Sequence, residues 1–89
     1  MSYTIEWKSS VRKQIRELHP TVRRRVIQAV TALADEPRPT GSAILTGSPG
    51  WRRIRVGGYR SSYDVRDEVL VVLVVRVGSR GSVYRRLEE

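Results

Sequence analysis

The chain has 89 residues, a net charge of +8 and no cysteine. This length fits one domain, which we expect to span residues 1–89, and the lack of cysteine excludes disulfides and thiol catalysis. The longest apolar run, VLVVLVV, is too short to cross a bilayer. The positive charge comes almost entirely from arginine, which favours a partner rich in phosphate or carboxylate groups.

The first half of the chain predicts one strand and two helices. Residues 3–7, YTIEW, alternate between apolar and polar side chains, as a strand does. Apolar residues then recur at helical spacing over residues 11–18 and again over residues 22–33. Ser9 or Ser10 is the expected cap of the first helix and Thr21 that of the second. The short join, which contains His19 and Pro20, predicts an antiparallel helical hairpin.

The second half predicts a loop followed by three strands. Residues 38–50 are expected to form the loop, with Ile44 and Leu45 held against the core. The period then becomes two, which places strands at 51–57, 59–66 and 69–77. The predicted order is β-α-α-β-β-β, an α+β fold in which an antiparallel sheet packs against the N-terminal helical hairpin.

Arginines concentrate on the first hairpin of this sheet. Arg53 and Arg55 share one face, roughly 6–7 Å apart by strand rise, while the residue between them points into the core. This spacing fits adjacent phosphates. The residues predicted to bind phosphate are Arg52, Arg53, Arg55 and Arg76.

Neither a metal nor a cofactor is expected. Asp64, Asp67 and Glu68 lie around a predicted turn and do not have the spacing of metal ligands. The single histidine, His19, lies between the two predicted helices and is predicted to be a helix-end residue rather than a catalyst.

The stretches LTGSPGWRRIRVGGYRSSYDV and VLVVLVVRVGSR, with SVY near the end, resemble the RelE/ParE superfamily of bacterial toxins. The resemblance covers nearly the whole chain and implies the same fold. RelE-like members are ribosome-dependent endoribonucleases that cut mRNA in the ribosomal A site, whereas ParE-like members inhibit DNA gyrase. The VY pattern favours the RelE-like branch.

The resemblance also implies roles for particular residues. Arg60 and Arg80 would stabilise the phosphorane, and Tyr84 would take the proton of the 2′-OH or orient it. The hairpin has arginine where RelE has lysine, and Ser79 stands where many relatives have histidine. Both differences bear on proton transfer rather than on phosphate binding.

The family further implies an acidic antitoxin that folds on the toxin to give a hetero-oligomer. The open basic face and an apolar groove beside the helices are the expected docking surfaces. Ribosome and mRNA would be the other partners, without a membrane. The N-terminus lacks the apolar run of a signal peptide, and we expect a cytoplasmic protein. A gyrase inhibitor and a degenerate toxin that only binds its antitoxin are the alternatives.

Overall fold

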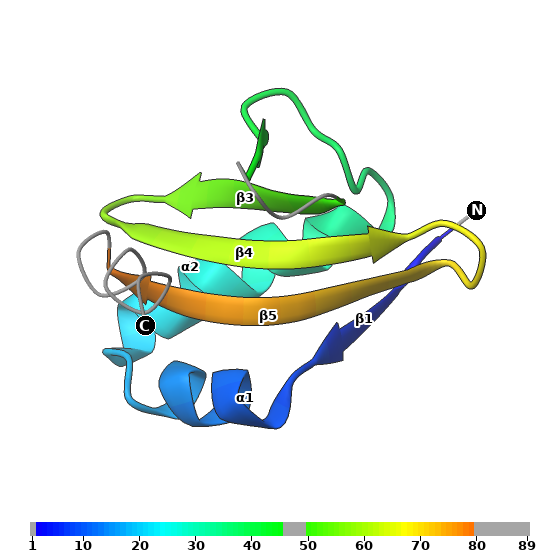
Figure 1. Cartoon of the computed structure of the whole chain (residues 1–89). Helices are drawn as coiled ribbons and strands as arrows, with labels where there is room; N and C mark the ends of the chain where they lie inside the picture. The colour runs from blue at the N-terminus through cyan, green and yellow to red at the C-terminus, as the bar shows by residue number, and fades with distance from the viewer. Residues whose placement is uncertain (1, 46–49, 80–89) are drawn as a thin grey trace.

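The computed structural model describes residues 2–45 and 50–79, which form two helices and a five-stranded sheet (Figure 1). The elements in chain order are β1 (Thr4–Trp7), α1 (Ser9–Arg16), α2 (Pro20–Thr31) with a 3-10 turn (Ala32–Ala34), β2 (Ala43–Ile44), β3 (Trp51–Val56), β4 (Tyr59–Arg66) and β5 (Val71–Ser79). The predicted α+β fold is confirmed. In the described part of the chain, no helix has the length and apolarity needed to span a membrane.

The sheet is mixed, with the strand order β1-β5-β4-β3-β2. The pairs β5–β4, β4–β3 and β3–β2 are antiparallel, whereas β1 runs parallel to β5. The expectation of an antiparallel sheet is therefore wrong at the β1 edge. Ile5 aligns with Val72 and Trp7 with Val74. The parallel pairing therefore places the apolar side of β1 beside fully buried valines of β5. The long connection that parallel strands require runs through both helices and then through β2, β3 and β4.

The connections between the strands agree only in part with the bounds predicted from the sequence. Gly57 and Gly58 join β3 to β4, and Gly57 has the positive φ of 62° that such tight hairpins favour. The turn before β5 is longer than predicted, because it continues to Leu70 with φ 53°. Residues 43–44 form the short edge strand β2, and Ile44 is 69% exposed rather than held in the core.

The helix caps also differ from those predicted. Lys8 occupies the N-cap of α1, without a side-chain hydrogen bond, so neither Ser9 nor Ser10 is the cap. His19 caps α2 in place of Thr21, and its Nδ1 accepts a hydrogen bond from the Thr21 backbone N–H at 3.2 Å. Pro20 follows at the first helical position, where its missing N–H costs nothing. The prediction that His19 marks a helix end is confirmed.

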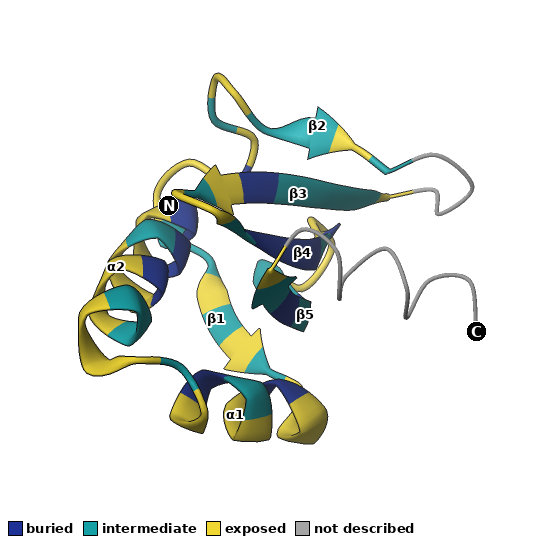
Figure 2. Ribbon diagram, turned by 90° about the vertical axis from the view of Figure 1, so that its left-hand side faces the viewer, coloured by how far each residue is buried: buried dark blue, intermediate teal, exposed yellow. Residues whose placement is uncertain are grey.

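Both helices pack against one face of the sheet (Figure 2), where the core forms. Its helical side comes from Val11, Ile15, Val26, Val30 and Leu33, and its sheet side from Ile54, Tyr63, Val65, Val72, Val74 and Val77. The Tyr63 side chain is fully buried, and its hydroxyl donates to the Pro37 carbonyl at 2.9 Å. Burial raises the pKa of this phenol, because the charged form is poorly solvated there.

A polar cluster connects three segments near the turn between β4 and β5. The Asp67 carboxylate accepts hydrogen bonds from the Arg38 guanidinium at 2.7 and 3.2 Å and from the Tyr3 hydroxyl at 2.6 Å. These hydrogen bonds, first from Arg38 and then from Tyr3, lower the pKa of Asp67. The cluster therefore ties the N-terminal segment and the loop after α2 to the sheet.

Candidate functional site

Strand register brings four of the predicted site residues to one face of the sheet. Arg53 of β3 is paired with Ser62 of β4, which is paired with Arg76 of β5. The next row contains Arg55, Arg60 and Gly78. Because residues directly opposite each other on paired strands project to the same side, Arg53, Arg55, Arg60 and Arg76 share a face, which we call the arginine face. It lies opposite the side that α1 and α2 cover.

The four arginines differ in exposure. Arg55 is exposed, Arg53 and Arg76 are partly buried, and Arg60 is only 4% exposed. Arg53 and Arg60 both make further non-covalent interactions. Arg55 and Arg60 are direct cross-strand partners, an arrangement in which like charges destabilise a sheet. The arginine face thus combines one buried cation, Arg60, with three neighbouring arginines that are at least partly accessible to solvent.

Arg52 does not join this group. Its register neighbour is Tyr63, on the side of the sheet that faces the helices. The Arg52 guanidinium donates to the Ser42 hydroxyl at 2.9 and 3.1 Å. The prediction placed Arg52 with the phosphate-binding arginines, but alternation along β3 turns it away from Arg53 and Arg55. We therefore leave Arg52 out of the candidate site.

Two predicted catalytic residues, Arg80 and Tyr84, lie outside the described residues. The position that differs from many relatives, Ser79, is described and is paired with Tyr59 at the end of β5. Tyr59 is also paired with Val56, and this row is next to the row of Arg60. Because adjacent rows project to opposite sides of the sheet, Ser79 faces away from the arginine face. By register, the replacement of histidine at position 79 does not remove a group from the arginine face.

Charge is unevenly distributed along this side of the sheet. The two rows that hold the arginines contain no acidic residue among their paired positions. Asp64 lies farther along β4 and forms an ion pair with Arg66 at 3.1 Å. Across residues 2–45 and 50–79, no group of three or more histidine, cysteine or acidic side chains is placed to hold a metal ion. The arginine face is therefore suited to binding phosphate and to neutralising charge that develops on it.

One residue of this face was missed by the sequence analysis. Ser62 lies between Arg53 and Arg76, yet it is 1% exposed. Its alternation with Arg60 along β4 was the available signal.

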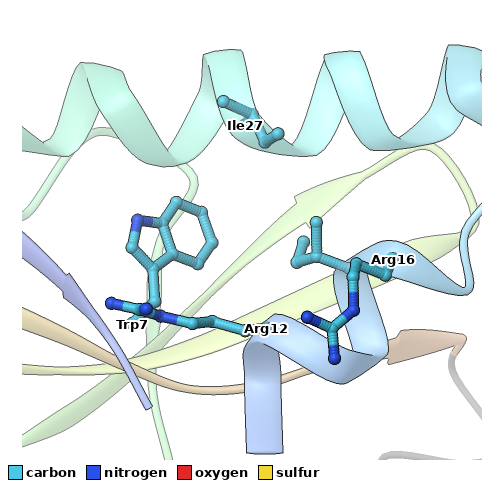
Figure 3. Close-up of a pocket in the computed structure, with 5 residues that line it drawn as sticks. Trp7, Arg12, Arg16 and Ile27 are labelled. Atoms are coloured by element: carbon cyan, nitrogen blue, oxygen red, sulfur yellow. The ribbon is translucent and has the colours of Figure 1, made fainter. Parts of the chain in front are cut away.

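A second feature lies in the helical layer. Trp7, Arg12, Ile15, Arg16 and Ile27 line a groove of about 300 Å³ between α1 and α2 (Figure 3). Ile27, on α2, is 38% exposed, and the two arginines of α1 supply positive charge at the groove. The predicted apolar groove beside the helices is thus present, on the opposite side of the molecule from the arginine face.

Comparisons with known proteins agree with this geometry. A family model described as the ParE toxin of a type II toxin–antitoxin system matches residues 5–84. Toxin RelG of Mycobacterium tuberculosis is 31% identical over 87 residues, covering 97% of this chain and 100% of RelG. The mRNA interferase toxin RelE of Escherichia coli K12 is 33% identical over 82 residues, covering 90% of this chain and 85% of RelE.

Solved structures show the same relationship. A free-state structure of an Escherichia coli RelE variant superposes with a TM-score of 0.82 at 31% identity, covering 99% of this chain and 94% of that one. A chain of the intact Escherichia coli RelBE toxin–antitoxin complex gives a TM-score of 0.78 at 32% identity, with 88% and 96% coverage. The resemblance stated from the sequence is confirmed: the chain belongs to the RelE/ParE superfamily of type II toxin–antitoxin toxins, and within it to the RelE-like toxins.

Proposed function

We propose that this toxin is a ribosome-dependent, metal-independent endoribonuclease that cuts mRNA in the A site through attack of a 2′-OH on the adjacent phosphate. The arginine face is the observation that carries the proposal, since it gathers four cations from three strands. The name of the Escherichia coli relative, an mRNA interferase at 33% identity, supports the same activity.

RNA cleavage of this kind needs stabilisation of a phosphorane that carries additional negative charge. Arg60 suits this role because it is nearly buried, and a fixed cation acts more strongly away from bulk water. Arg55, its cross-strand partner, is exposed and would meet the same phosphate from the solvent side. Arg53 and Arg76 would hold a flanking phosphate.

Proton transfer requires a different group. Arginine is a poor general base because its pKa lies above about 12. We assign the 2′-OH proton to the ionised form of Tyr84 and further charge stabilisation to Arg80, as the family resemblance implies. The attack forms a 2′,3′-cyclic phosphate, and the departing 5′-oxygen takes a proton from Arg80 or from a ribosomal group. An ordinary tyrosine with a pKa near 10 is only about 0.1% ionised at pH 7. Such a weak base accounts for dependence on the ribosome, because orienting the mRNA can lower the barrier by several kcal/mol.

The same proposal includes an acidic antitoxin as the partner. Relatives of this chain have been solved as RelB–RelE complexes from Escherichia coli and Pyrococcus horikoshii. The charge of +8 would attract an acidic segment and would be offset by it. The groove between α1 and α2 offers apolar surface for such a partner. The site of action would be the cytoplasm, where ribosomes translate mRNA.

Inhibition of DNA gyrase is the second candidate, because the matching family model is described as a ParE toxin. A toxin without catalysis is a third, since the two paired rows of the arginine face contain no histidine, tyrosine or carboxylate. Both candidates predict that the protein leaves mRNA intact on the ribosome.

The deciding experiment is primer extension on mRNA from ribosomes stalled with a defined codon in the A site. Wild-type protein should produce cuts within that codon and leave ribosome-free mRNA largely intact. Arg53→Ala and Arg52→Ala make a matched pair, because each removes one positive charge from adjacent positions on opposite faces of β3. We expect Arg53→Ala to lower kcat/KM at least about tenfold, the cost of a charged hydrogen bond, and Arg52→Ala to remain within about threefold.

Absence of ribosome-dependent cuts, from folded protein that still binds its antitoxin, would refute the nuclease. A parallel supercoiling assay then separates the remaining candidates, because a gyrase inhibitor blocks supercoiling and a degenerate toxin does not. Equal losses in Arg53→Ala and Arg52→Ala would show that overall charge, rather than the arginine face, drives the activity.

A further inference from the structure

Two adjacent serines in β4 are buried without hydrogen-bond partners. Ser61 and Ser62 are each 1% exposed, and neither hydroxyl has a partner among the described residues. An unpaired buried hydroxyl destabilises a fold, and such groups in proteins commonly have a functional explanation or meet a bound water or ion. The two serines differ in the side to which they project, so they call for separate explanations.

The neighbours of Ser61 are apolar and those of Ser62 are cationic. Ser61 is paired with Ile54 and Val77, which belong to the core. Ser62 is paired with Arg53 and Arg76 on the arginine face. Both arginines are one strand away from it, and the strand spacing sets them about 10 Å apart. By register, the Ser62 side chain thus leaves the sheet between those of Arg53 and Arg76.

A β-bulge produces this arrangement. The register of β4 and β5 shifts between Ser62 and Tyr63, so that Tyr63 is paired with Val74 while Ser62 is paired with Arg76. Val75 is the extra residue in β5. Without the bulge, Val75 would lie opposite Ser62, and Arg76 would alternate to the side of Val74 in the core. Bulges are enriched next to active sites, where they redirect a side chain.

We propose that Ser62, Arg53 and Arg76 form a subsite for one phosphate of the RNA backbone, separate from the reacting phosphate at Arg55 and Arg60. The Ser62 hydroxyl donates to a phosphate oxygen, and the two guanidinium groups bind the anion from either side. The subsite deepens the proposed function and rests on it for the identity of the ligand. Inorganic phosphate and a backbone phosphodiester both offer anionic non-bridging oxygens as acceptors.

The subsite is closed in the free protein, because Ser62 is 1% exposed. Phosphate entry therefore requires the surrounding side chains to separate. The hydroxyl gains its missing partner only in the bound state, so its stabilising effect should appear only when an anion is present. This conditional effect distinguishes a binding serine from one that is merely buried.

Ser62→Ala and Ser61→Ala are the matched variants, with inorganic phosphate as the probe. Thermal unfolding is measured at pH 7 in chloride and in phosphate at equal ionic strength. In chloride we expect both variants to melt above wild type, since each loses an unpaired buried hydroxyl. In phosphate we expect wild type and Ser61→Ala to gain several degrees in Tm by linkage. Ser62→Ala should gain much less, with phosphate affinity reduced about tenfold. Arg76→Gln, an independent variant, should also lose the gain.

Equal phosphate gains in Ser62→Ala and Ser61→Ala would overturn the subsite, as would an Arg76→Gln variant that keeps the gain of wild type. Phosphate binding does not require catalysis, which separates this test from that of the proposed function. Ser62-dependent phosphate binding without mRNA cleavage would refute the nuclease alone. Cleavage with an unchanged KM in Ser62→Ala would refute the subsite alone.

Discussion

The opposed pair of Arg55 and Arg60 predicts a conflict between stability and activity. Replacing Arg55 with glutamate would convert a cross-strand pair of like charges into a pair of opposite charges. Opposite charges directly across a sheet contribute roughly 0.2–1 kcal/mol, and like charges destabilise. Summing the lost repulsion and the new attraction gives a gain of roughly 0.5–2 kcal/mol. In a domain of this size each kcal/mol shifts Tm by about 4–8 °C.

Arg55→Gln is the control, because it removes the charge without reversing it. We expect Tm to rise in the order wild type, Arg55→Gln, Arg55→Glu. The differences should shrink in 1 M NaCl, because Arg55 is exposed and its interaction is screened. Thermal unfolding followed by circular dichroism at low and high salt measures both effects.

Activity should change in the opposite direction. A carboxylate at position 55 repels phosphate, and we expect Arg55→Glu to lower kcat/KM in the ribosome cleavage assay by at least about 100-fold, or about 2.7 kcal/mol. Arg55→Gln should fall between it and wild type. An Arg55→Glu variant that melts below Arg55→Gln would refute the repulsion, and one that cleaves like wild type would remove Arg55 from the site.

Three further predictions concern the frame that holds the arginine face. Tyr63→Phe removes the buried hydrogen bond to the Pro37 carbonyl and should lower the free energy of unfolding by about 1–2 kcal/mol, as urea titration measures. The ionised Asp67, whose pKa is lowered, stabilises the fold fully above its ordinary pKa of 3.8 and loses this effect as pH falls further; Asp67→Asn should therefore flatten the decrease of Tm below about pH 4. Gln14→Leu leaves the Val77 backbone N–H without its 2.9 Å acceptor, and hydrogen exchange at that amide should accelerate.

Local periodicity predicted most elements because each depends on neighbours in sequence. The strand expected at 59–66 matches β4, Tyr59–Arg66, since alternation and two turn signals bound it. The helix cap was misplaced because Pro20 at the first helical position makes His19 the cap, even though Thr21 has the more favourable side chain. His19 and Thr21 are thus competing candidates for the cap, and the position of Pro20 at the start of the helix decides between them.

Long-range pairing accounts for what the sequence could not reveal. The parallel position of β1 beside β5 depends on packing between segments more than 60 residues apart. Simple alternation along β5 would place Arg76 on the same side as Val72 and Val74, and only the bulge turns it toward Arg53. Arg76 was predicted from its charge, and its place on the arginine face rests on a register shift that periodicity does not encode.

The core and the arginine face depend on the same strand register. Ile54 lies between Arg53 and Arg55 and is 8% exposed, so alternate residues of β3 serve the two sides of the sheet. A slip of one residue would expose Ile54 and turn both arginines into the core. Burial of Ile54 against the helices therefore also fixes the positions of the arginines. The hydrophobic side can in this way hold a cluster of like charges that the outer side alone would disperse.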